Sequence, residues 1–238
     1  LVGSLYDALL PNFSSDKANI CCDEAWQMGE ERSRKAVEER GARQVYFDYL
    51  LDMRRRARRH VDRVLFWGDM LVPFHIRRNE ESGLYEPLPR EPNPLLDELP
   101  GDMTALVWGY RPDDPLGPMA REYAEAGIPF YVCPGTSAWC SFLGRHDRML
   151  GNVETAVAAA AEHGAEGLLM CDWSVHGWHP LAVAWPGVAY AAGMAWAPAS
   201  NGGMDLPSVL DTHVFRHTAG RAGRVVCALG NVYQLPDA

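Results

Sequence analysis

The sequence predicts an α/β protein of the (β/α)8 TIM-barrel type. Five short apolar runs alternate with helical segments, and no hairpin signal joins one run to the next, which indicates parallel strands connected by crossovers. Each run also ends in aromatic or acidic residues, and a barrel builds its active site at the carboxyl ends of its strands. The five runs lie within residues 18–26, 63–67, 104–108, 128–133 and 167–171.

Five units are fewer than the eight of a complete barrel. We expect the chain to carry strands 4 to 8 of a barrel whose early strands lie outside this sequence, or else to form an incomplete sheet. A complete barrel would then need either the missing N-terminal barrel segment or self-association of the chain. A nucleotide-binding sheet is disfavoured because no glycine-rich phosphate loop follows any strand. The expected organisation is one partial barrel catalytic domain over 1–238, with a long loop insert at 70–102 and a helical C-terminal region at 204–238.

The segments between the runs carry helical patterns with recognisable ends. A first helix closes at Pro11, residues 30–40 and 42–61 form helices separated by Gly41, and the helix over 115–126 stops at Gly127. Residues 152–163 form a further helix, with Asn152 as its N-cap and Gly164 as its stop. Later helices are expected over 183–196 and 206–216, with a final helical stretch ending near 231. The proline-rich loop at 70–102 has the length of a lid, a binding loop or an insert.

The composition excludes some partners. A net charge of -9, from 31 acidic and 22 basic residues, argues against nucleic acid as a partner. The basic cluster at 54–59 continues a helical pattern without interleaved aromatics and is interpreted as a solvated helix face. No apolar stretch is long enough to cross a bilayer. The 6 cysteines are scattered, and buried free thiols favour a reducing compartment such as the cytoplasm, although the localisation is otherwise unknown.

Two adjacent carboxylates, Asp23 and Glu24, stand at the end of the first run. Side chains of neighbouring strand residues diverge, so these two carboxyl groups can reach different parts of one ligand and hold different protonation states. The alternative is an Asp-Glu pair that opens the next helix, where negative charge suits the helix dipole. The other four strand ends favour the first interpretation, because they carry functional side chains of their own.

Those other strand ends suggest a sugar pocket, in which indoles stack on pyranose rings while polar groups bind hydroxyls. For glycoside hydrolysis Glu24 would protonate the leaving oxygen. Either Asp69 or Asp172 then supplies the second carboxylate, or the substrate's own 2-acetamido oxygen attacks while Asp23 orients the amide. The adjacency of the two acids favours the second route. The candidate substrate-binding residues are Trp67, Asp69, Trp108, Tyr131, Trp139, Asp172, Trp173 and His176.

Residues 19–24, Asn-Ile-Cys-Cys-Asp-Glu, resemble the His-x-Gly-Gly-Asp-Glu signature of family 20 glycoside hydrolases, the β-N-acetylhexosaminidases. Phe-Trp-Gly-Asp at 66–69, the strand end at Trp108, and Asp172-Trp173 follow in the order of that barrel's fifth, sixth and eighth strands. The resemblance covers residues 18 to about 196. It implies that Asp23 orients the acetamido group, that Glu24 is the acid/base, and that Trp67 and Trp173 are pocket walls. It also implies that Tyr131, or a residue within 136–139, fills the role of the family's tyrosine at the acetamido oxygen.

The chain departs from that family at several positions. Asn19 replaces the histidine of the signature, and Cys21 and Cys22 replace its two glycines. Val175 stands where the family's Trp-x-Glu has its glutamate, so Asp172, His176 or His179 would have to bind the outer hydroxyls of the sugar. Asp172, His176 and His179 are also residue types that bind metal ions. Gly177 and Pro180 disfavour a helix at this position, and no metal is assigned.

The leading hypothesis is therefore a hydrolase that removes terminal β-linked N-acetylhexosamine from an oligosaccharide or glycoconjugate by a substrate-assisted, retaining mechanism. It needs no cofactor. One alternative is an ordinary glycosidase that uses Glu24 with Asp69 or Asp172. Another is a carbohydrate-binding protein without turnover, in which the tryptophans stack on sugars and the carboxylates only hydrogen-bond to them.

Overall fold

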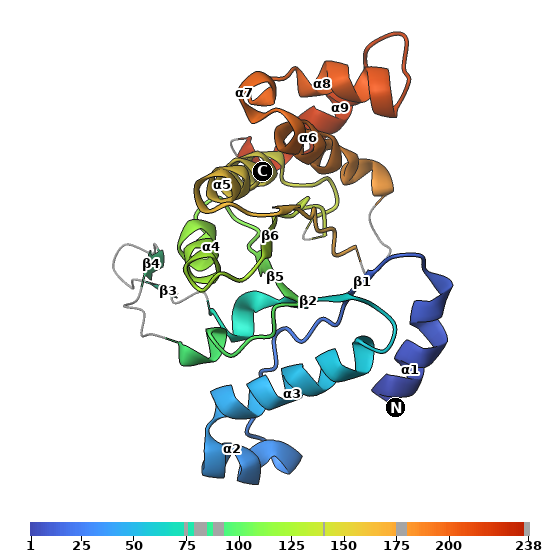
Figure 1. Cartoon of the computed structure of the whole chain (residues 1–238). Helices are drawn as coiled ribbons and strands as arrows, with labels where there is room; N and C mark the ends of the chain where they lie inside the picture. The colour runs from blue at the N-terminus through green and yellow to red at the C-terminus, as the bar shows by residue number, and fades with distance from the viewer. Residues whose placement is uncertain (74–75, 79–84, 88–92, 140, 175–179, 236–238) are drawn as a thin grey trace. The chain divides into compact units, whose positions relative to one another are not determined.

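The computed structural model describes residues 1–73, 76–78, 85–87, 93–139, 141–174 and 180–235 (Figure 1). Hydrogen bonds join β1 (Lys17–Asn19), β2 (Arg63–Trp67), β5 (Met103–Trp108), β6 (Phe130–Cys133) and β7 (Gly167–Leu168) in the order β1-β2-β5-β6-β7. The predicted α/β class with a parallel sheet is confirmed, and strands that follow one another along the chain are neighbours. The chain divides into two compact units, unit 1 (1–107 and 118–131) and unit 2 (108–117 and 132–238).

In unit 1, β1 and β2 pair in parallel with Lys17 opposite Arg63, and β2 and β5 pair with Val64 opposite Met103. The helices α1 (Val2–Leu9), α2 (Arg34–Arg40) and α3 (Ala42–Ala57) are drawn in blue in Figure 1, where α3 contacts the other two. Gly41, at φ 81°, separates α2 from α3 as predicted. One face of α3 is buried through Tyr46, Phe47, Leu50, Met53 and Ala57, at helical spacing.

The first strand is shorter than the predicted run at 18–26. The Ile20 N–H donates a hydrogen bond to the Leu65 carbonyl of β2 at 2.9 Å. This is the last hydrogen bond from the run to β2 that keeps the register of the strand pair. Cys21, Cys22 and Glu24 then have φ values of 61°, 68° and 48°. Residues in this left-handed region cannot extend a strand, so the chain leaves the sheet before the two acids.

The insert at 70–102 holds more regular structure than the sequence predicted. Strands β3 (Ile76–Arg78) and β4 (Tyr85–Pro87) pair antiparallel within it, and a 3-10 turn spans Pro94–Leu96. The segment was predicted as a loop insert, and these two strands were not predicted. Two strands of three residues are too short to give a side-chain alternation that can be recognised in a sequence.

Helix α4 (Leu116–Glu125) links the two units and stops before Gly127, at φ 68°. In unit 2, α5 (His146–His163) ends at Gly164, at φ 73°, as predicted, but it begins six residues before Asn152. Asn152 is therefore a buried residue inside the helix, and its prediction as an N-cap was wrong. Helix α5 packs against α6 (Trp185–Trp196) around a core of Met149, Val153, Tyr190, Ala191, Met194, Leu206 and Leu210.

The rest of unit 2 consists of short helical elements: α7 (Pro198–Asn201), α8 (Leu206–Val209), a π-helical turn at Leu210–Val214, α9 (Ala222–Leu229) and a 3-10 turn at Val232–Gln234. These elements make much of the described part of 204–238 helical. Within the portions of the chain that the structure describes, no helix has both the length and the apolar character that a membrane span requires.

Candidate functional site

The predicted acid pair belongs to a tight turn after β1, which we call the acidic turn (residues 20–24). The Asn19 side-chain oxygen accepts a hydrogen bond from the Cys21 N–H at 2.9 Å, and the Cys21 carbonyl accepts one from the Trp67 N–H at 3.0 Å. Left-handed backbone costs a non-glycine residue about 1–2 kcal/mol. The turn therefore adopts a costly conformation at Cys21, Cys22 and Glu24, as is common at functional sites.

Asp69 holds the acidic turn from the end of β2. Its carboxylate accepts a hydrogen bond from the Glu24 N–H at 3.1 Å, and the residue is only 5% exposed. Asp69 sits in the 3-10 turn Gly68–Met70, where the Gly68 carbonyl accepts a hydrogen bond from the Tyr123 hydroxyl at 2.7 Å. A Cβ on Gly68 would lie 2.7 Å from that hydroxyl oxygen, so the close approach requires glycine.

Helix α3 holds the acidic turn from another direction. The Tyr46 hydroxyl donates a hydrogen bond to the Cys22 carbonyl at 2.8 Å. Burial raises the pKa of Tyr46 far above its ordinary value, with a further contribution from the Cys22 thiol. The phenol is therefore protonated and acts as a donor, and it fixes the backbone that carries the two acids.

The environment of the acidic turn favours neutral side chains. Burial raises the pKa of Glu24, and the neighbouring charges of Asp23 and Asp69 raise it further. Burial also raises the pKa of Cys21, and that of Cys22 to about 12, so both thiols are protonated at neutral pH. Glu24 is exposed and Asp23 is half-buried, so the carboxyl group with the raised pKa faces solvent and can meet a ligand. A raised carboxyl pKa is the direction of shift that a general acid needs.

Unit 1 places the predicted residues in two locations. Trp67 is 5% exposed, and its indole hydrogen-bonds to Cys21, so it lies with Asp69 beside the acidic turn. Tyr131 lies elsewhere, because its hydroxyl oxygen accepts a hydrogen bond from the ammonium group of Lys17, the first residue of β1, at 3.3 Å.

In unit 2 the structure brings together four aromatic residues, which we call the aromatic cluster: Trp108, Tyr110, Trp139 and Trp173. Tyr110 is at its centre, stacked on Trp108 with 5.1 Å between ring centroids and edge-to-face with Trp139, also at 5.1 Å. The Trp173 indole donates a hydrogen bond to the Tyr110 hydroxyl oxygen at 2.7 Å. The three tryptophans were predicted as site residues; Tyr110 was not, and its only signal in the sequence is its place two residues after Trp108.

Asp172 lies beside the aromatic cluster in sequence and is exposed. One of its carboxylate oxygens accepts a hydrogen bond from the Thr136 hydroxyl at 2.7 Å, and the other accepts one from the Ser174 hydroxyl. Both partners are themselves hydroxyl groups that can rotate. The carboxylate is oriented by these bonds and still accessible to solvent.

Asn152 is the second residue that the sequence analysis missed. Its side-chain oxygen accepts a hydrogen bond from the Gly135 N–H at 2.9 Å, and its amide donates to the carbonyls of Gly109 and Arg111 at 2.9 and 3.2 Å. It is fully buried, so these bonds compensate for the loss of water. Asn152 thereby ties the end of β6 to the segment after β5 and fixes the backbone around Tyr110.

Gly135 gives the aromatic cluster its close packing, and we expect Gly135→Ala to destabilise the protein by about 1–3 kcal/mol. A Cβ there would lie 2.4 Å from the Trp139 ring and 2.7 Å from the Tyr110 ring. Urea unfolding measures the change, with Gly203→Ala as the matched control, since a Cβ on Gly203 meets nothing within 4 Å. Equal midpoints for the two variants would contradict the close packing.

His176 and His179, with Val175, lie outside the described residues. In the part of the chain that the structure does cover, no group of three His, Cys, Asp or Glu side chains is arranged to hold a metal ion.

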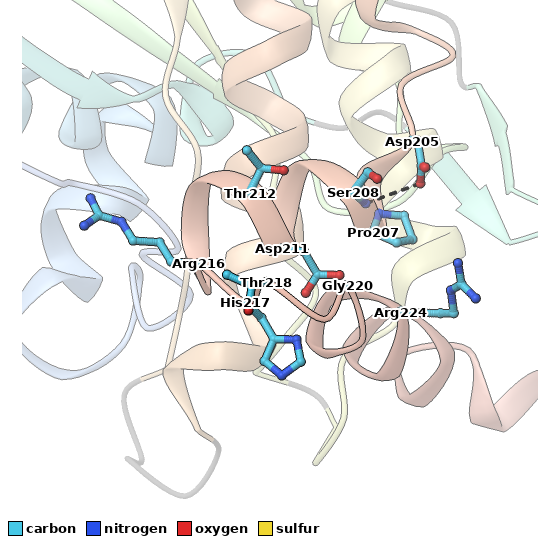
Figure 2. Close-up of a pocket in the computed structure, with 10 residues that line it drawn as sticks. All are labelled: Asp205, Pro207, Ser208, Asp211, Thr212, Arg216, His217, Thr218, Gly220 and Arg224. Atoms are coloured by element: carbon cyan, nitrogen blue, oxygen red, sulfur yellow. Dashed lines mark hydrogen bonds between the residues drawn. The ribbon is translucent and has the colours of Figure 1, made fainter.

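A cavity of about 490 Å³ lies among the C-terminal helices of unit 2. Figure 2 shows its lining, with Asp211 near the centre and Arg216 and Arg224 pointing away from each other. Asp211 is 8% exposed and accepts a hydrogen bond from the Gly223 N–H at 2.9 Å. Among the predicted site residues that the structure describes, none lines this cavity.

The acidic turn is thus the candidate functional site, because it is the place where adjacent acids, a raised carboxyl pKa and a constrained backbone coincide. No protein-family model and no curated protein matches this chain.

Proposed function

We propose that this chain is a glycoside hydrolase that removes terminal β-linked N-acetylhexosamine, with its strands supplying the later part of a (β/α)8 barrel. The observation that carries the proposal is the acidic turn, where Asp23 and Glu24 are adjacent and the pKa of Glu24 is raised. A substrate-assisted mechanism needs one carboxyl group that donates a proton and a neighbouring one that binds the acetamido N–H.

In the first step, Glu24 donates its proton to the glycosidic oxygen while the carbonyl oxygen of the 2-acetamido group attacks the anomeric carbon. The bond to the leaving group breaks, the aglycone departs as an alcohol, and an oxazolinium ion forms. The Asp23 carboxylate accepts a hydrogen bond from the amide N–H and stabilises the positive charge of the oxazolinium ion. In the second step, the Glu24 carboxylate takes a proton from a water molecule that attacks the anomeric carbon, which restores the acetamido group with retained configuration.

The backbone of the acidic turn supports the resemblance to family 20. Cys21 and Cys22 stand at the positions of the two glycines in the family signature, and they have φ values of 61° and 68°. Glycine is the residue that adopts this region at little cost. The chain thus keeps a glycine-like backbone at both positions although its side chains differ.

The surroundings of Asp69 argue against the form of the two-carboxylate alternative in which Asp69 is the nucleophile. This residue is buried and accepts a hydrogen bond from the Glu24 backbone, which fits a positioning residue better than a nucleophile that must reach the sugar. For unit 2 the proposal is that a pyranose face stacks on the aromatic cluster, whose indoles are half-buried and therefore partly accessible.

The test compares hydrolysis of 4-methylumbelliferyl β-glycosides of N-acetylglucosamine, N-acetylgalactosamine and glucose. We expect kcat/KM for an N-acetylated substrate to exceed that of the glucoside by at least about 100-fold, because only the former brings its own nucleophile. Equal cleavage of the glucoside would contradict neighbouring-group participation. Binding of N-acetylglucosamine without hydrolysis of any substrate would favour a carbohydrate-binding protein instead.

A further inference from the structure

A second cavity, of about 310 Å³, lies in unit 1 next to the acidic turn, and we call it the leaving-group cavity. One of its lining residues is Ala25, which follows Glu24 in the sequence. Its lining comes from the segment after the acidic turn and from the first two turns of α3, and consists of Ala25, Gln27, Met28, Ser33, Val45, Tyr46 and Tyr49.

The surface of this cavity is mostly carbon. Two of its hydroxyl groups are already engaged: that of Ser33 accepts a hydrogen bond from the Gly29 N–H and donates to the Glu30 carbonyl, both at 2.9 Å, and that of Tyr46 donates to Cys22. A ligand therefore meets the tyrosine rings, the Met28 thioether and the Val45 methyl groups. Such a lining suits an apolar ligand better than a second sugar, which would need several polar partners.

The cavity is linked to the acids through Tyr46 as well as through Ala25. The Tyr46 hydroxyl holds the Cys22 carbonyl at 2.8 Å, one residue before Asp23. Burial is the main cause of the raised pKa of Tyr46, and the charges of Asp69 and Asp23 add to it, so this side chain lies within electrostatic range of Asp69 and of Asp23. One side chain thus forms a wall of the cavity and a support of the acidic turn.

We propose that this cavity binds the aglycone, and that the substrate class is a β-N-acetylhexosaminide of an alkyl or aryl alcohol. The inference rests on the proposed function, in which Glu24 protonates the oxygen that joins sugar and aglycone. The departing group must lie near that carboxyl, and the next residue along the chain, Ala25, lines the apolar cavity. At about 30 Å³ for each water-sized group, its volume holds about ten non-hydrogen atoms, the size of an octyl or phenyl-ethyl chain.

The experiment compares methyl and octyl β-N-acetylglucosaminide, the latter below its critical micelle concentration. Both leaving groups are primary alcohols of similar acidity, so a rate difference reports binding of the chain rather than leaving-group chemistry. We expect kcat/KM to be about 10- to 100-fold higher for the octyl glycoside, from burial of its methylene groups. Met28→Ala and Tyr49→Ala are expected to lower this octyl-to-methyl ratio. The control Trp196→Ala, at a residue 88% exposed in α6, should leave the ratio unchanged.

The outcomes separate this inference from the function on which it rests. Suppose that the enzyme prefers N-acetylated substrates but that the octyl-to-methyl ratio of kcat/KM is near one. This result would overturn the proposal that the cavity binds the aglycone and leave the proposed function intact. Faster cleavage of chitobiose than of the octyl glycoside makes the aglycone a sugar and also overturns the inference. If no glycoside is cleaved, the proposed function fails. Calorimetry then decides on the cavity, since octyl glycoside must bind more tightly than methyl glycoside and lose that advantage in Met28→Ala.

Discussion

Replacing Glu24 with glutamine is expected to lower kcat for methyl β-N-acetylglucosaminide by about 10²- to 10⁴-fold, the usual contribution of a general acid. A methoxide leaving group cannot depart without a proton, and glutamine has none to donate. The loss should be much smaller in the first step for a 4-nitrophenyl glycoside, because that leaving group departs as a stable anion. Steady-state and pre-steady-state rates for the two substrates measure the difference.

Glu30→Gln is the matched control for this experiment. Glu30 is an exposed carboxylate on the same segment, six residues further along the chain, and it has no part in the proposed chemistry. Because Glu24 is also exposed, the Glu24→Gln variant should unfold at nearly the same urea concentration as the wild type. A folded Glu24→Gln variant that cleaves the methyl glycoside at a rate similar to that of the Glu30→Gln variant would exclude Glu24 as the acid.

Replacing Asp23 with asparagine is expected to lower kcat for N-acetylated substrates by about 10²- to 10³-fold, as when one stabilising group is removed from a developing charge. The neutral amide cannot balance the charge of the oxazolinium ion. The Asp23 charge also contributes to the raised pKa of Glu24. Its removal lowers that pKa, so the protonated acid is lost at a lower pH. The alkaline limb of the kcat/KM profile should therefore move to lower pH.

Asp69→Asn separates these two effects. The Asp69 charge also raises the pKa of Glu24, behind burial and Asp23, so this variant should move the alkaline limb in the same direction. Asparagine keeps an oxygen that can accept the Glu24 N–H, and the variant should therefore retain the preference for N-acetylated substrates. If Asp69→Asn instead abolishes activity while Asp23→Asn does not, the two-carboxylate mechanism is correct.

The parts of the fold that the sequence predicted well are those with strong local signals. The strands β2, β5 and β6 are continuous apolar runs, and Gly41, Gly127 and Gly164 end or separate helices at positive φ values. The end of β1 could not be predicted, because nothing in Cys21, Cys22 or Glu24 favours a left-handed backbone. Asp69, Tyr46 and their tertiary hydrogen bonds hold that conformation, and such contacts leave no periodic pattern in the chain.

The candidate site shows the same difference between residues that have a local sequence signal and residues that are placed by tertiary contacts. The tryptophans at strand ends were predicted from the repeated position of large aromatics, yet their arrangement around Tyr110 depends on the close approach at Gly135. Asn152 was taken for an N-cap, since asparagine favours that position. Helix α5 continues through it because three hydrogen bonds to other segments satisfy its buried amide.

The most direct measurement of the division of labour between Asp23 and Glu24 is the inhibition constant of N-acetylglucosamine thiazoline, a stable analogue of the oxazolinium ion. We predict that the wild type binds this thiazoline at least about 100-fold more tightly than N-acetylglucosamine, as expected for an analogue of a reactive intermediate. That advantage should be lost in Asp23→Asn and kept in Asp69→Asn. A thiazoline that binds the wild type no more tightly than the free sugar, or that binds Asp23→Asn equally well, would contradict the proposed mechanism.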